Sequence, residues 1–318
     1  MITISLSTMI SLAALIIVGY SLEKKNILDE HTINKFSNFL LTITFPAMLI
    51  GAFNVDLSTS KIIDPTIPSN IYMPIILGFL VYILLFMVCI LTIKPLKVKK
   101  EHKDIILFSL LFGNTSFIGF PLISSVLGQD ALIYMVLLNI PFNIIVFSLG
   151  TYILADDKKH YVDFKNILLT PVMFGMYIGL SLMMLNIFFN VSIPSFIESP
   201  INMLGDMTPP LSMIIVGCSL TKANIPKAIK TPVFYYISLL KLLIIPIITY
   251  LIFSIFMNNN VLLLELIIFT GVPTATISVV FARSYKLDHV YASEIILITT
   301  ILSLLSIPFL FYLFGFLA

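Results

Sequence analysis

The side chains that could do chemistry in this chain are amides and hydroxyls set inside long apolar runs. They gather in residues 113–121, residues 270–276 and an apolar run between these two stretches. Amides and hydroxyls can donate or accept hydrogen bonds without carrying charge, so this chemistry is ligand binding rather than bond breaking. The candidate binding residues are Asn114, Thr115, Ser116, Pro121, Asn139, Asn143, Pro273, Thr274 and Thr276.

Two of these stretches are predicted to interrupt a helix. Residues 113–121 read GNTSFIGFP and residues 270–276 read TGVPTAT. Glycine and proline weaken a helix, and Ser, Thr and Asn side chains compete for its backbone hydrogen bonds. Inside a bilayer such an interruption is tolerated only where it is buried in protein or lines a wet cavity. Paired breaks in the two halves of a chain are typical of secondary transporters.

The breaks favour an anionic ligand. Half-helices beginning near Thr115 and Thr274 would direct the N–H groups and positive dipole ends of their N-termini into the cavity. The nearby hydroxyls and the Asn114 amide could orient a carboxylate. Asn139 and Asn143 have two open interpretations: they bind ligand, or they satisfy the first interrupted helix from a kinked neighbour.

Lys241 lies near the middle of another apolar run. A lysine at that depth costs about 2.5 to 3.5 kcal/mol on insertion scales, which favours a functional role. A structural lysine that pairs with a carboxylate, or with carbonyls freed by a helix break, is the alternative. Asp206, Glu265 and Glu294 are the candidate acidic partners, and all three are predicted to be interfacial. Asp206 is the favoured candidate for a proton-linked role.

Composition places the chain in the membrane. Hydrophobic residues make up 59% and charged residues 11% of its 318 residues, and the mean hydropathy is +1.08. The net charge of +2 does not indicate a basic surface of the kind that binds nucleic acid. The residue pattern contains no nucleophile–base pair, P-loop or metal-ligand spacing, so neither an enzyme nor a cofactor or metal is predicted.

The predicted fold class is an all-α polytopic membrane protein with ten spans, each of roughly 18 to 27 residues. The basic residues concentrate in every second connection between spans. Sixteen of the 18 fall in the odd-numbered connections, which the positive-inside rule makes cytoplasmic. Both termini are then outside the cell. The spans lie near residues 3–20, 34–53, 70–93, 105–127, 131–154, 167–189, 200–220, 231–257, 261–282 and 292–317.

An odd number of spans in each half requires a second half that repeats the first upside down. The second span of each half carries a proline motif around Pro46 or Pro209, and the fourth carries the break. The predicted divisions are a first five-helix repeat at 1–155, a short cytoplasmic connection at 156–166 and an inverted repeat at 167–318. Gly175 and Gly179 form a small-xxx-small pair for helix packing, either internal or in a dimer.

These motifs resemble the auxin efflux carrier family, which includes plant PIN carriers and bacterial malate or malonate permeases. The resemblance covers essentially the whole chain. It rests on residues 113–121 together with Gly19-Tyr20, Phe45-Pro46-Ala47, Pro210-Leu211-Ser212, Gly217-Cys218-Ser219-Leu220, Lys241 with Pro246, and Pro273-Thr274-Ala275.

The resemblance implies two inverted five-helix repeats whose broken helices cross near Pro121 and Pro273, with substrate bound beside the crossing. It also implies a scaffold part of spans one, two, six and seven, an elevator-like movement of the other spans, and homodimerisation through the scaffold. The long cytoplasmic loop of the plant carriers is absent from this sequence.

The resulting hypothesis is a plasma-membrane carrier of small organic anions such as mono- or dicarboxylates. The alternatives are a cation/proton antiporter of similar fold and a membrane-embedded ligand sensor. Against the antiporter, the predicted midplane offers amides and Lys241 but no carboxylate pair.

Overall fold

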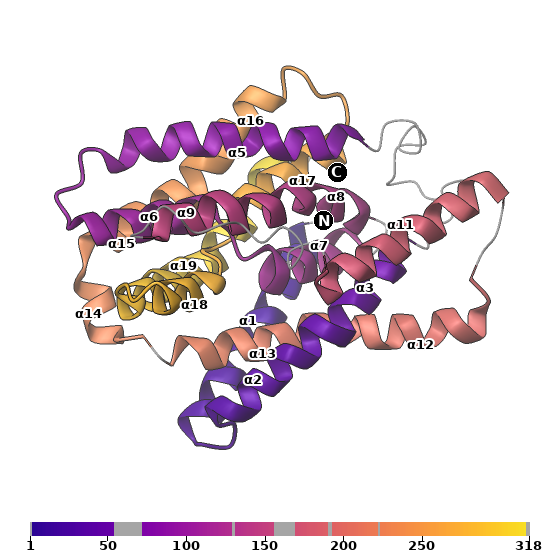
Figure 1. The fold of residues 1–318 in the computed structure, drawn as a ribbon, viewed down its shortest axis with the longest axis horizontal. Helices are drawn as coiled ribbons and strands as arrows, with labels where there is room; N and C mark the ends of the chain where they lie inside the picture. Colours follow the sequence, from indigo (N-terminus) through magenta and orange to yellow (C-terminus); the bar gives the residue numbers. More distant parts are fainter. Residues whose placement is uncertain are drawn as a thin grey trace.

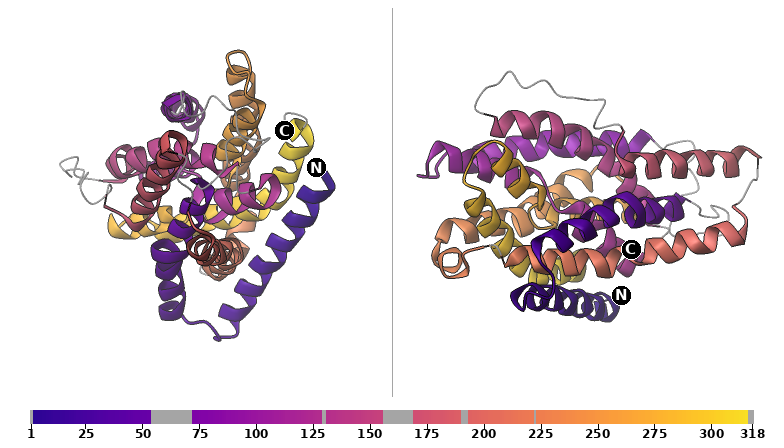
Figure 2. Two further views of the ribbon diagram at one scale, coloured as in Figure 1. Left: turned by 90° about the vertical axis from the view of Figure 1, so that its right-hand side faces the viewer. Right: turned by 60° about the horizontal axis from the view of Figure 1, so that its bottom comes forward.

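The computed structural model describes residues 2–53, 72–128, 131–155, 169–189, 193–221 and 223–315. These residues form a helical bundle in which α5 lies in the plane of Figure 1 and is seen end-on on the left of Figure 2, where α1 runs across the view. The first half contains α1 (Ile2–Lys24), α2 (Glu30–Phe39), η1 (Leu40–Thr44), α3 (Phe45–Phe53), α5 (Tyr72–Ile93), α6 (Lys100–Leu111), η2 (Thr115–Gly119), α7 (Phe120–Leu127), α8 (Leu132–Ile145), η3 (Val146–Gly150) and α9 (Thr151–Leu154).

The second half repeats the alternation of long and interrupted elements. It contains α11 (Pro171–Phe189), α12 (Ser195–Asp206), α13 (Thr208–Leu220), α14 (Ile225–Lys230), α15 (Pro232–Leu239), η4 (Leu240–Ile244), α16 (Ile245–Phe253), α17 (Asn260–Gly271), α18 (Ile277–Ser284) and α19 (His289–Phe314). The connection predicted at 156–166 lies outside the described residues.

Six helical segments of the described chain are long and apolar enough to cross a membrane. They are Glu30–Phe53, Tyr72–Ile93, Leu132–Leu154, Ser195–Leu220, Pro232–Phe253 and His289–Phe314. Shorter apolar helices cover Thr115–Leu127, Pro171–Asn186 and Asn260–Gly271. The prediction of an all-helical, multi-pass protein is therefore confirmed for the described residues, and the count of ten spans stays a prediction.

Three of the prolines explain the wide helical turns that precede them. A proline has no N–H to donate to the carbonyl four residues earlier, and its ring clashes with that carbonyl. The chain responds with a π turn just before Pro46, Pro121 and Pro246. In each turn the preceding residue donates five residues back: Phe45 to Leu40, Phe120 to Thr115 and Ile245 to Leu240. These helices continue through their prolines with a local widening.

Glycines set the closest helix contacts. A Cβ built on Gly19 of α1 would lie 2.1 Å from the Ile214 carbonyl oxygen of α13, and one on Gly217 would lie 2.0 Å from the Ile16 oxygen. The two backbones touch there, and the Cys218 thiol donates to the Gly19 oxygen at 3.2 Å. The predicted small pair in α11 also packs internally, because Gly175 and Gly179 lie against Pro46 and Phe53 of α3.

The ends of α6, α14 and α19 are tied together by charged side chains. The Asp288 carboxylate accepts a hydrogen bond from the Tyr291 amide at 2.9 Å and lies 3.2 Å from His102 Nε2. The His102 ring stacks on Tyr291, with ring centroids 3.9 Å apart. Lys227 Nζ lies 3.2 Å from Glu294 Oε2. Glu294, predicted to be interfacial, is fully buried by its protein neighbours, whereas its partner Lys227 is half-exposed.

The Asp288 contacts predict a pH-dependent contribution to stability. Partial burial favours the neutral carboxyl, but the Tyr291 amide and the His102 ring outweigh it, so the pKa of Asp288 lies below its ordinary value. The stabilisation is then present above the unfolded-state pKa, about 3.9, and is lost as pH falls through the folded-state value. We expect the gap in melting temperature between the wild type and Asp288→Asn to narrow below about pH 4. A gap that is constant down to the acid limit would contradict this.

Candidate binding site at the helix crossing

The first break separates α6 from η2. Helix α6 ends at Leu111, and Asn114 then caps η2, because its side-chain oxygen accepts a hydrogen bond from the Phe117 amide at 3.3 Å. Gly113 is required between them, since a Cβ at this position would lie 2.5 Å from a Val272 methyl group. Asn and Gly thus interrupt the helix for separate reasons, one by capping and one by permitting close approach.

The second break lies against the first. After α17 ends at Gly271, the chain runs extended and forms an antiparallel bridge between Thr274 and Gly113. The backbone N–H of Asn114 donates to the Pro273 carbonyl oxygen at 2.7 Å, and the backbone N–H of Ala275 donates to the Phe112 carbonyl oxygen at 3.0 Å. Both predicted interruptions are therefore confirmed, and they pair with opposite chain directions.

The carbonyl groups that the end of α6 leaves without a helical partner accept hydrogen bonds from residues on the other side of the crossing. Lys241 Nζ donates to the Leu110 oxygen at 2.9 Å, and the Thr274 hydroxyl donates to the Ser109 oxygen at 3.2 Å. Lys241 is 1% exposed. A cation near a helix C-terminus is favourable, so the alternative of a lysine that pairs with freed carbonyls matches its contacts. Its nitrogen also lies 3.5 Å from the Cβ position of Gly113, directly behind the break.

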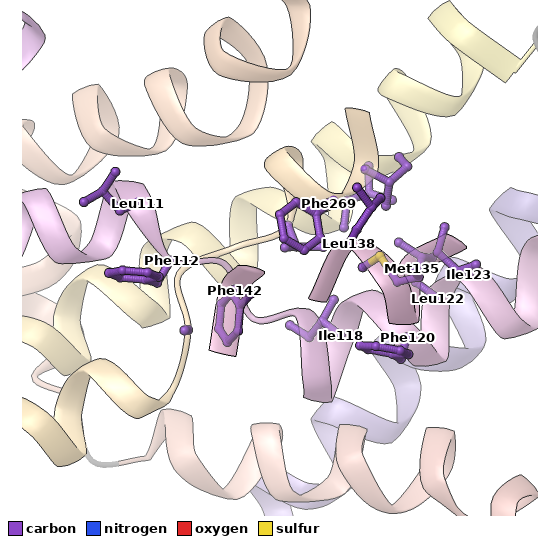
Figure 3. Close-up of a cluster of buried hydrophobic side chains, with 14 of the residues drawn as sticks. Leu111, Phe112, Ile118, Phe120, Leu122, Ile123, Met135, Leu138, Phe142 and Phe269 are labelled. Atoms are coloured by element: carbon purple, nitrogen blue, oxygen red, sulfur yellow. The ribbon is translucent and has the colours of Figure 1, made fainter. Parts of the chain in front are cut away.

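Aromatic side chains pack around the crossing. Tyr82 of α5 lies with its ring centroid 5.8 Å from Phe112, 6.5 Å from Phe142 and 6.2 Å from Phe269. Figure 3 shows Phe112 and Phe142 beside the non-helical connection, with an apolar cluster behind them. The crossing is therefore enclosed by packed rings on the side of α5, α8 and α17.

A cavity of about 550 Å³ opens beside the crossing. It is walled by the crossing, by α2 and by parts of α8, η3, α11, α13, α18 and α19. Its described polar lining consists of Asn34, Ser37, Asn38, Thr42, Asn114, Thr115, Ser116, Asn143, Thr170, Cys218, Ser219, Thr276 and Ser293.

Five of the predicted site residues line this cavity: Asn114, Thr115, Ser116, Asn143 and Thr276. Asn139 lies behind them, where its side-chain oxygen accepts from the Thr115 hydroxyl at 2.9 Å and its carbonyl accepts from Asn143 Nδ2 at 3.0 Å. Pro273 and Thr274 form the crossing itself, with the Thr274 amide donating to the Thr299 hydroxyl at 3.3 Å.

The prediction that the helices cross near Pro121 is wrong. The chains pair at Gly113 and Thr274, while Pro121 is buried in α7, one turn or more beyond the break. It is not among the described residues that line the cavity. The π turn from Thr115 to Gly119 absorbs this proline, so the crossing forms at the glycine instead.

Asp206 and Glu265 differ in exposure, and neither side chain is among the described residues that line the cavity. Asp206 is exposed at the end of α12 and is not among the described cavity residues, so the crossing does not bring it to the site. Glu265, also predicted to be interfacial, is fully buried near the start of α17. It lies beside the backbone of Met135 in the first turn of α8, where helix N–H groups favour a carboxyl.

Sequence reasoning missed the wall that α2 contributes. Asn34, Ser37, Asn38 and Thr42 recur at helical spacing, and all four line the cavity. That spacing, which places the four polar side chains along one side of the helix, was the available signal.

The comparisons with known proteins agree with this arrangement. A family model described as "membrane transport protein" matches residues 4–166 and 160–311, one match in each half. An uncharacterized transporter of Methanocaldococcus jannaschii is 28% identical over 307 residues, covering 92% of this chain and 93% of the relative. An uncharacterized transporter of Methanothermobacter thermautotrophicus is 22% identical over 325 residues, covering 96% of each chain. The chain therefore belongs to the membrane transport protein family, the family of the auxin efflux carriers.

Proposed function

We propose that this transporter is a secondary carrier of small organic anions that binds its substrate at the helix crossing. The observation that carries the proposal is the state of Asn114. Its side-chain oxygen is used to cap η2, its side-chain nitrogen has no hydrogen-bond partner among the described residues, and the residue lines the cavity. A buried donor without an acceptor is costly, and a carboxylate oxygen would satisfy it.

The helix ends at the crossing support an anion rather than a cation. The N-terminus of η2 and the Thr276 end of α18 both reach the cavity. Each carries the positive end of a helix dipole, and together they form a site of the kind that binds carboxylates. The cation antiporter alternative would need carboxylates at the site, and the described cavity lining contains none.

Ten spans in two inverted repeats of five, with an elevator movement, are part of the proposal. The separate family matches to the two halves and the antiparallel pairing of the breaks support it. The packing supports it too: α1 lies along α13, and α3 lies against α11 and α12, which groups the helices predicted to form the scaffold. We propose that this group also forms a homodimer in the plasma membrane, as the family resemblance implies.

The cavity is proposed to face the cytoplasm in this structure. Its described lining runs from the crossing toward the ends of the helices that carry the basic connections. It includes the start of α2, the start of α11, the end of α13 and the part of α18 before Arg283. Under the positive-inside rule that side is cytoplasmic.

The function is tested by counterflow in proteoliposomes with labelled acetate, pentanoate, benzoate, malonate and malate. We expect at least one acid to exchange through the wild-type protein, and Asn114→Ala to reduce that exchange about tenfold or more. The variant loses both the η2 cap and the unpaired donor, each worth about 1 kcal/mol or more.

Asn202→Ala in α12 is the matched control, because Asn202 is not among the described cavity residues. The melting temperature of each variant shows that it is folded. Exchange of no acid by the wild type, or unchanged exchange by Asn114→Ala, would refute the assignment. Ligand binding without exchange would favour the sensor alternative.

A further inference from the structure

The cavity has no charged wall among the residues that the structure describes. Its polar lining consists of amides, hydroxyls and one thiol, and no Asp, Glu, Lys, Arg or His side chain belongs to the described lining. Lys241 lies behind the crossing and is held by the Leu110 carbonyl. The positive potential that an anion meets is therefore concentrated at one place, the two helix N-termini of the crossing.

The facing wall of α2 is polar but neutral. We call Asn34, Ser37 and Asn38 of α2, together with Thr42 of the η1 turn that continues it, the α2 stripe; it spans about 12 Å at about 1.5 Å per residue. The Ser37 and Thr42 hydroxyls donate to carbonyls of their own helix, at 2.9 Å and 2.7 Å. The side-chain amides of Asn34 and Asn38 make no hydrogen bond among the described residues, and both residues are exposed to the cavity.

Apolar side chains make up much of the remaining wall of the cavity. The described ones are Ile33, Leu41, Phe117, Phe142, Val146, Phe147, Pro171, Val172, Ile215, Val216, Ala275, Ile277, Val279, Val280 and Ile296. A ligand that fills this cavity must place most of its surface against carbon. Such burial stabilises an apolar body by roughly 25 cal/mol per Å².

We propose that the site selects monocarboxylates with an apolar body and discriminates against dicarboxylates. This inference rests on the proposed function of the same site. One carboxylate is satisfied by Asn114 and the helix N-termini. A second would lie among apolar side chains or beside neutral amides, without a cation to compensate for the water it loses.

The α2 stripe then determines what the far end of the ligand can carry. The Asn34 and Asn38 amides can bind a hydroxyl, carbonyl or N–H group, but they cannot neutralise a charge. Asn38 is the position at which a cation would relax the selectivity, because it lies midway along the stripe and is exposed. A lysine there would supply the missing partner for a distal carboxylate.

The test compares pentanoate with glutarate, which have the same carbon chain and differ by one carboxylate. Both compete against the exchange of labelled pentanoate in proteoliposomes, at a pH where both glutarate carboxyls are ionised. We expect the wild type to prefer pentanoate by about tenfold or more, which corresponds to about 1.4 kcal/mol. In Asn38→Lys the preference should shrink about tenfold through tighter glutarate binding.

Asn38→Gln is the matched variant, which keeps the amide and should keep the preference. Thermal stabilisation of each purified protein by the two acids gives a second measurement, independent of flux. Equal or tighter binding of glutarate by the wild type would overturn this inference while the carrier function stands. So would an unchanged preference in a folded Asn38→Lys protein. Binding of neither acid, with malonate and malate also inactive, would refute the proposed function itself.

Discussion

Gly217→Ala is expected to abolish stable folding or to lower the melting temperature more than any other single methyl addition proposed here. The new Cβ would lie 2.0 Å from the Ile16 oxygen and 2.8 Å from the Tyr20 nitrogen. Both atoms belong to the α1 backbone, so no side-chain rotation can relieve the clash. Overpacking costs about 1 to 3 kcal/mol where neighbours can shift, and this contact falls at or above the upper end.

Gly315→Ala is the control for this prediction, because a Cβ at that position meets no atom within 4 Å. Gly19→Ala should behave like Gly217→Ala, since its Cβ would lie 2.1 Å from the Ile214 oxygen. Thermal unfolding in detergent, followed by size-exclusion chromatography, measures the difference. If Gly217→Ala melts within a degree or two of Gly315→Ala, the α1–α13 contact is looser than the structure shows.

Lys241→Met is expected to separate the two interpretations of this lysine. The free energy of unfolding should fall by about 1 to 3 kcal/mol, because the buried Leu110 oxygen loses its donor. Substrate binding should weaken. At an effective dielectric constant of about 20, the loss of a nearby unit charge is expected to weaken the affinity for an anion about tenfold, which corresponds to about 1.4 kcal/mol.

The measurement is the concentration of acid needed for half-maximal exchange, taken together with the melting temperature. Lys241→Gln is the companion variant: it can still donate to the Leu110 oxygen, but it carries no charge. If both variants bind substrate as tightly as the wild type, Lys241 is purely structural. If Met unfolds the protein while Gln preserves both stability and affinity, the hydrogen bond matters and the charge does not.

The two interruptions were predictable because their causes are local. Gly113, Asn114 and Pro273 weaken or cap a helix wherever they occur, and the surrounding hydrophobicity sets their depth. The point of crossing was not predictable, because it depends on which backbone groups of two distant segments pair. A proline was the more visible marker at Pro121, but a π turn accommodates it within the helix.

The polar groups of the site were predictable only in part. Amides at the breaks stand out against their apolar surroundings. The α2 stripe does not, because Asn and Ser near the start of a span look like ordinary interfacial residues. The burial of two acids was not predictable either: Glu265 and Glu294 lie near span ends in the sequence, yet neighbouring helices cover both completely. Depth along a span does not tell which neighbour covers a side chain.

The short antiparallel bridge at Gly113 and Thr274 has a mechanical consequence. The Asn114–Pro273 and Ala275–Phe112 hydrogen bonds join the two interrupted helices at one point. Lys241 and Thr274 donate hydrogen bonds to the neighbouring carbonyls of α6. Bending one helix alone would break several of these bonds at once. The two interrupted helices are therefore expected to move together as one rigid unit.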